Sequence, residues 1–104
     1  MKTMPWKQEV IDKYFGGLPL IVLEAEISTQ SKMLYLVIHH LARSKGYSWA
    51  NAKYYSTLLK MTERQYRYYR QELEAHNIIW TKENQDSASW IYPRYLIPTY
   101  VEKK

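Results

Sequence analysis

The side chains best suited to chemistry lie between residues 43 and 71, where basic and aromatic residues alternate. This stretch holds seven Lys and Arg side chains and one carboxylate, Glu63, whereas the rest of the chain holds eight basic and nine acidic side chains. The net charge of +5 is therefore concentrated in one segment, which also contains six of the eleven tyrosines. A local positive field with interleaved aromatic rings is typical of a surface that binds a polyanion. The alternative is a solvated face with scattered basic residues.

Within this segment, the spacing of arginine and glutamine fits the reading of DNA bases. If Tyr66, Tyr69 and Leu73 face a core at helical spacing, the opposite stripe of the same helix is polar. That stripe consists of Arg64, Arg67, Tyr68 and Gln71, with Gln65 beside it. Arginine can pair with guanine through two hydrogen bonds, glutamine can do the same with adenine, and tyrosine can bond phosphate. We expect this helix to enter the major groove; the alternative is an amphipathic helix with a charged outer face.

Phosphate contacts are expected on both sides of this helix. The candidates are Lys45, Lys53 and Lys60, and also Arg43. When one helix lies in the major groove, the helix that precedes it crosses the DNA backbone. Tyr54 and Tyr55 are adjacent and cannot both face inward, so we place Tyr55 in the core and Tyr54 towards DNA. The predicted DNA-binding residues are Lys53, Tyr54, Lys60, Thr62, Arg64, Gln65, Arg67, Tyr68 and Gln71.

Other chemistry finds little support in the sequence. There is no cysteine, and the neighbouring His39 and His40 do not share a helix face, so we expect no metal site. Triad, HExxH and phosphate-loop patterns are absent, and we predict no catalytic activity and no cofactor. No apolar run is long enough for a membrane span, and the absence of cysteine favours a reducing cytoplasm.

Three helices must position these side chains, at about residues 29–44, 50–60 and 63–76. Ser28 is a predicted N-cap, and Thr62 with Gln65 three residues later forms a capping box. Asn77 suits the left-handed position after the third helix. In the second helix we expect Leu58 to point inward and Trp49, at its entry, to pack as core or staple.

Two strands follow the helices, and one is expected before them. Residues 78–82 and 90–95 predict an antiparallel hairpin, in which Pro93 either marks an edge or ends the strand early. The apolar run at residues 18–23 predicts a short edge strand around Pro19.

Residues 1–17 are expected to form an additional amphipathic helix. Pro5 can open it, an apolar stripe through Trp6, Val10 and Tyr14 follows at helical spacing, and Gly16 with Gly17 ends it. The stripe either packs on the body of the protein or pairs two copies into a homodimer. Residues 98–104 form a tail.

Four short motifs carry a resemblance to a known family: residues 31–35 (SKMLY), 46–51 (GYSWAN), 62–65 (TERQ) and 73–79 (LEAHNII). In order and spacing they resemble the winged helix-turn-helix domains at the N-termini of replication initiators and replisome organisers of Gram-positive plasmids and phages. The resemblance covers about residues 18–97. It implies an α+β, mainly α, fold with a three-helix core and a two- or three-stranded antiparallel wing. The family often has a glycine where this chain has Asn77 and an aliphatic residue where it has Arg70.

Two functions are compatible with these features. The first is a double-stranded DNA-binding protein of a plasmid, phage or other mobile element, which acts in replication initiation or transcription regulation. A replication or partition protein would then be a further partner. The second is a winged helix that docks a protein partner, with incidental DNA contact. The second is favoured by the high tyrosine content and by Glu83 and Asp86, because the wing of this family is often basic.

Overall fold

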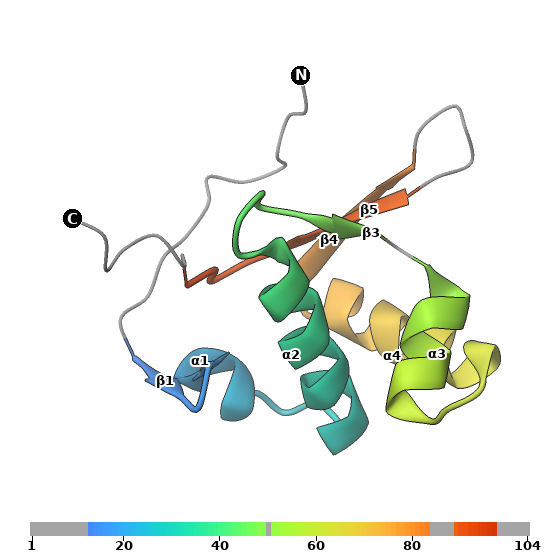
Figure 1. Ribbon diagram of the computed structural model, residues 1–104. Coiled ribbons are helices and arrows are strands. Elements are labelled where there is room, and N and C mark those ends of the chain that lie inside the picture. The colour runs from blue at the N-terminus through green and yellow to red at the C-terminus, as the bar shows by residue number, and fades with distance from the viewer. Residues whose placement is uncertain (1–12, 50, 84–88, 98–104) are drawn as a thin grey trace.

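Helix α2, Thr29–Ala42, lies at the centre of the fold and contacts the two helices that follow it and the three-stranded sheet. Residues 13–49, 51–83 and 89–97, which the computed structural model describes, form an α+β fold with four helices and two antiparallel sheets. Helices α3, Ala52–Leu59, and α4, Glu63–Ala75, pack against each other and against α2 (Figure 1). The three helices predicted from the sequence are confirmed, and each observed boundary differs from the predicted one by two residues at most.

The helix boundaries follow from local capping. The Ser28 hydroxyl accepts a hydrogen bond from the Ser31 amide at the start of α2, as predicted. Asn77, with a φ of 60°, takes the left-handed position after α4, also as predicted. Helix α2 ends at Ala42 rather than near the predicted residue 44. The chain then turns at Gly46, which has a φ of 90°. Only glycine takes that conformation without steric cost.

A three-stranded sheet covers α2 and α4 on one side (Figure 1). Strands β4, Ile79–Glu83, and β5, Ser89–Pro93, pair antiparallel with Trp80 opposite Tyr92, which confirms the predicted hairpin. Strand β5 is central and ends at Pro93, so the proline ends the strand early rather than marking an edge. The third strand, β3, comprises Ser48 and Trp49 and pairs with β5 on its other side.

The core lies between this sheet and the helices. Its fully buried aromatic and aliphatic side chains come from all four described helices and the sheet, and they include Val22, Leu34, Tyr35, Ile38, Tyr55, Tyr66, Leu73, Ile79 and Ile91. The Tyr35 hydroxyl donates a hydrogen bond to the Arg94 carbonyl and joins α2 to the segment after β5. Burial raises the pKa of Tyr35 far above its ordinary value, so this donor keeps its proton.

The predicted N-terminal helix is wrong where it can be compared. Residues 1–12 lie outside the described residues, but Tyr14–Phe15 is a strand, β1, which pairs with a second strand, β2, Leu18–Pro19. Gly16 and Gly17 both have positive φ and form the two-residue turn between these strands. A glycine pair favours this tight hairpin as much as it favours the end of a helix.

The predicted strand at residues 18–23 is confirmed only over its first two residues. Leu20–Leu23 forms one helical turn instead, α1, in which the Glu24 amide donates to the Leu20 carbonyl over 2.9 Å. This turn fully buries Val22 against the core. An apolar run of this length can form either structure, so its sequence alone did not distinguish a strand from a helical turn.

Trp49 and Leu58 are also misplaced by the sequence prediction. Trp49 belongs to β3 rather than to the second helix, and 58% of it is exposed. Leu58 lies on the outer side of α3 and is 50% exposed, whereas its neighbour Leu59 packs against the core. Helix α3 begins only at Ala52, because pairing with β5 holds the preceding segment extended.

Candidate nucleic-acid interface

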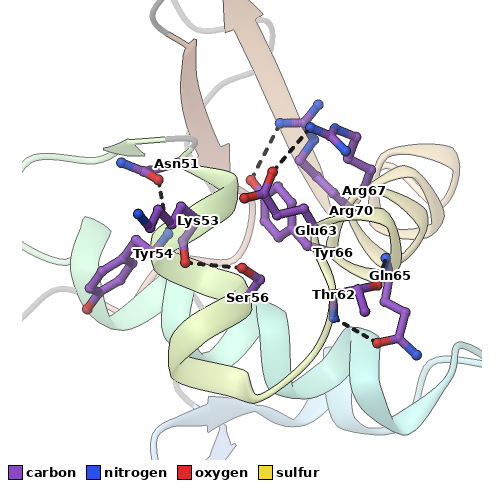
Figure 2. A network of polar contacts seen from close by, with 10 residues as sticks. All are labelled: Asn51, Lys53, Tyr54, Ser56, Thr62, Glu63, Gln65, Tyr66, Arg67 and Arg70. Carbon is purple, nitrogen blue, oxygen red and sulfur yellow. Dashed lines mark hydrogen bonds and ion pairs between the residues drawn. The ribbon is translucent and has the colours of Figure 1, made fainter.

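Helices α3 and α4 are joined by a tight turn that is built from backbone conformation and side-chain caps. Lys60 ends α3 in the left-handed conformation, with a φ of 57°. Two residues later Thr62 caps α4: its hydroxyl accepts from the Gln65 amide over 3.0 Å, and the Gln65 side-chain oxygen accepts from the Thr62 amide over 2.9 Å (Figure 2). This confirms the predicted capping box, which satisfies two amides at the start of α4.

A stack of two buried tyrosines holds the inner faces of α3 and α4 together. The rings of Tyr55 and Tyr66 are nearly parallel, at 6°, with their centroids 5.3 Å apart. The Tyr55 hydroxyl is within hydrogen-bonding distance, 3.0 Å, of the Ser48 hydroxyl in β3. Burial raises the pKa of Tyr55 to about 12, so the ring stays neutral at physiological pH. The stack fixes the orientation of α4 relative to α3 and therefore of their outer side chains.

The outer face of α4 carries the predicted stripe. Arg64, Gln65, Arg67, Tyr68 and Gln71 are all exposed, and Tyr68 is 63% exposed. Arg67 forms an ion pair with Glu63 one turn earlier, at 3.6 Å, in which both side chains are about half exposed (Figure 2). An exposed pair of this kind contributes less than about 1 kcal/mol. The guanidinium can therefore leave Glu63 for a stronger acceptor at little cost.

The preceding helix supplies the flanking cations. Lys53 and Tyr54 lie in the first turn of α3 and are exposed, and Lys60 is exposed at its end. The Asn51 side-chain oxygen accepts from the Tyr54 amide over 3.0 Å and caps this helix (Figure 2). The structure thus leaves all nine predicted DNA-binding residues exposed on α3, α4 and the turn between them. Thr62 and Gln65 already use one side-chain oxygen each in the cap.

Two basic residues of the segment make contacts within the protein instead. The Arg43 Nε donates to the Ile97 carbonyl over 3.2 Å, which uses this side chain to hold the segment after β5. Arg70 is partly buried, with its guanidinium 5.5 Å from the centre of the Tyr66 ring and its Nε 3.8 Å from the Glu74 carboxylate. The guanidinium of Arg70 thus lies over the ring of a buried core tyrosine.

Sequence reasoning missed a polar cluster that joins the start of α2 to α4. The Glu72 carboxylate accepts hydrogen bonds from the hydroxyls of Ser28, over 2.9 Å, and Ser31, and from the Ser28 amide. The Ser31 hydroxyl, aided by the bonds from Ser28, holds the pKa of Glu72 below its ordinary value. The available signal was Ser31 itself, a polar side chain on the apolar seam of α2, which is fully buried.

Among residues 13–49, 51–83 and 89–97, no three His, Cys, Asp or Glu side chains gather closely enough to hold a metal ion. None of the helices in the same ranges has the length and apolar composition needed to cross a membrane. What α3 and α4 present is a row of hydrogen-bond donors and cations on a fixed scaffold, which suits an anionic partner.

The chain matches no known family model, and no curated protein and no solved structure matches it either.

Proposed function

We propose that the protein is a winged helix-turn-helix that binds double-stranded DNA, with α4 in the major groove. The observation that carries the proposal is the exposed stripe of α4, which directly follows a tight turn and a capping box. In this arrangement the second helix of the pair reads bases with its N-terminal half, while the first crosses the backbone. Arg64 and Arg67 lie in that half, and Lys53 lies on the first helix.

The hairpin of β4 and β5 supports the same proposal, because it follows α4 in the position of a wing. Strand β3 makes this wing three-stranded. We further propose that the DNA belongs to a plasmid or phage, in replication initiation or transcription regulation. The support for this is the resemblance of residues 18–97 to the N-terminal domains of replication initiators. The proposal places the protein in the cytoplasm.

The test compares two variants on a DNA site selected with the purified protein. Arg67→Ala is expected to cost about 1–3 kcal/mol at the preferred site and to relax preference at one base position. Lys53→Ala should weaken binding to all sequences about equally and lower the salt slope by about one unit. Fluorescence anisotropy with the selected site and with single-base variants of it measures both effects.

Glu63→Gln is the matched control for Arg67→Ala. It removes the ion-pair partner at 3.6 Å but leaves the arginine in place, so DNA affinity should stay the same or rise. If Arg67→Ala keeps both affinity and base preference while remaining folded, α4 does not read the DNA and the proposal fails.

A second candidate function is docking of a protein partner. It is favoured by a hollow of about 390 Å³ between α2, α3 and the β1–β2 turn, where Leu41, Tyr54 and Leu58 expose apolar surface. If a protein partner binds there, its affinity should be unchanged by Arg67→Ala and lowered by Leu58→Ser. DNA binding, in contrast, should tolerate Leu58→Ser.

A further inference from the structure

A second hollow, of about 370 Å³, lies where the C-terminal end of α2, strand β3 and the start of α3 meet. Its walls include three aromatic residues, Tyr47, Trp49 and Tyr54. Trp49 is 58% exposed and Tyr54 is 46% exposed. Large aromatic side chains usually bury most of their surface, so two neighbouring exposed rings at one hollow indicate a surface that is covered when a partner is bound.

The rings are held in place without being stacked on their neighbours. Trp49 meets Trp90 of β5 almost edge-on, with an angle of 76° and 6.1 Å between the ring centroids. Tyr54 meets Tyr55 in the same way, at 77° and 5.4 Å. The pairing of Trp49 with Trp90 in the sheet fixes the backbone beneath the indole. A fixed aromatic ring loses little conformational freedom when a flat partner stacks on it.

The charge around the hollow is positive. Lys45 lines it and is exposed, and Lys53 projects from the first turn of α3, next to Tyr54. The described lining residues include no carboxylate. Of their remaining polar side chains, Ser44 and Asn51 are exposed and can donate hydrogen bonds, whereas Ser48 is buried and its hydroxyl pairs with that of Tyr55. Aromatic walls with a cation at the edge match a base and its phosphate better than they match a purely apolar peptide.

We propose that this hollow binds an unpaired base of a single DNA strand, stacked on Trp49, with the adjoining phosphates held by Lys45 and Lys53. Sequence-tolerant binding of single strands uses the same combination of aromatic platforms and a cationic groove. The inference goes beyond duplex binding by α4. It rests on the proposed function only in that Tyr54, which lines the hollow, and its neighbour Lys53 in α3 both belong to the proposed duplex-binding residues, so an unpaired strand would leave the duplex beside the hollow.

The test measures the affinity of the full chain for a labelled twelve-residue oligothymidine at low salt. Trp49→Ala is expected to weaken this binding about fivefold or more, because one stacked base is lost. Trp49→Phe should restore most of the affinity. Phe15→Ala is the matched control, since Phe15 is 68% exposed in β1 and does not line the hollow. Melting curves confirm that each variant is folded.

A second measurement needs no variant. An abasic strand of the same length keeps every phosphate but offers no base, so the wild-type protein should bind it at least about fivefold more weakly than oligothymidine. Equal affinity for the two strands would overturn the inference. An unchanged affinity of Trp49→Ala for oligothymidine would also overturn it. So would thymidine monophosphate that binds as tightly as the strand, because the hollow would then be a nucleotide pocket.

Duplex binding, measured in parallel, separates the two proposals. If the protein binds its selected duplex but not oligothymidine, the hollow has no strand-binding role and the proposed function stands. If Trp49→Ala instead turns a dimer into a monomer in sedimentation, the hollow is a contact between copies and the inference is also overturned.

Discussion

At the scale of single residues, His39 shows how a titratable side chain is held neutral in the core. It is almost fully buried in α2, its Nε2 accepts a hydrogen bond from the Ile97 amide over 2.9 Å, and its ring lies 5.6 Å from that of Tyr35. Burial, and secondarily the charge of Arg43, lower the pKa of His39 to about 4. An accepting Nε2 requires the neutral imidazole, so protonation would break this contact.

This pKa predicts a loss of stability in weak acid. The unfolded chain binds a proton on His39 near pH 6.5, whereas the folded protein resists protonation down to about pH 4. The free energy of unfolding should therefore fall as the pH drops from 6.5 to 4, by an amount of the order of 3 kcal/mol. Urea denaturation at several pH values in this window measures the decrease.

Two variants isolate the contribution of His39. His39→Gln cannot titrate, so its stability should change much less over the same pH window, although it is less stable at pH 7. His40→Gln alters the exposed neighbour and should keep most of the decrease, because burial and Arg43 lower the pKa of His39 more than His40 does. A wild-type protein with constant stability between pH 6.5 and 4.5 would show that His39 is not held neutral.

At the scale of elements, the turn between α3 and α4 combines a structural demand with a proposed binding role in one residue. Lys60 has a φ of 57° at the end of α3. This left-handed conformation is unfavourable for residues other than glycine and asparagine. The same residue is a proposed phosphate contact. A glycine at this position would relieve the backbone and remove the charge.

Lys60→Gly is therefore expected to raise the free energy of unfolding by up to about 1 kcal/mol and to lower affinity for duplex DNA. Lys53→Ala is the matched control: it removes an exposed lysine from the helical part of α3 and should change stability by less than about 0.5 kcal/mol. Thermal melting and anisotropy on the same samples compare the two. A Lys60→Gly variant that loses stability would show that the left-handed cap is not strained.

What could be predicted about the elements depended on whether the information was local. The caps at Ser28, Thr62 and Asn77 lie within a few residues of the amides or turns they stabilise, so sequence spacing located them. The extended segment at Trp49 could not be found this way, because its partner Trp90 lies far along the chain in β5. The position of Leu58 was likewise decided by packing against distant elements rather than by its own helix.

The exposure of the candidate residues was predicted better than the bounds of the surrounding elements. Helical spacing places Arg64, Arg67 and Gln71 on the outer face once Tyr66 and Leu73 are buried, and the structure confirms both burials. The roles of these residues in DNA binding stay predictions. The hollow beside Trp49 could not be predicted from the sequence, because it forms only where three elements meet.

At the scale of the whole molecule, the charge of +5 and its location govern association with any anionic partner. Each phosphate neutralised lowers the logarithm of the binding constant by about 0.9 per tenfold rise in salt. If Lys45, Lys53 and Lys60 each neutralise one phosphate, duplex affinity should fall about 40-fold between 50 and 200 mM salt. Anisotropy titrations at four salt concentrations measure this slope.

A protein partner docked on apolar surface would bind with nearly the same affinity across this range. A flat salt dependence would therefore contradict phosphate contacts by these lysines and favour the second candidate function. The triple variant with alanine at all three lysines provides the internal reference, since its slope should be shallower by about three units.

The Glu72 cluster also suggests an order in which we expect the molecule to fold. The carboxylate meets Ser28 and Ser31 across sequence separations of 44 and 41 residues, whereas the capping box of the same helix spans three. Closing a long loop loses chain entropy before the contact can form, so non-local pairs tend to form late. The first turn of α4 can therefore form in the otherwise unfolded chain. We expect its last turns to be anchored only once α2 has packed against them. We therefore expect the end of α4 that carries Arg64 and Arg67 to gain local structure before the rest of the protein folds around it.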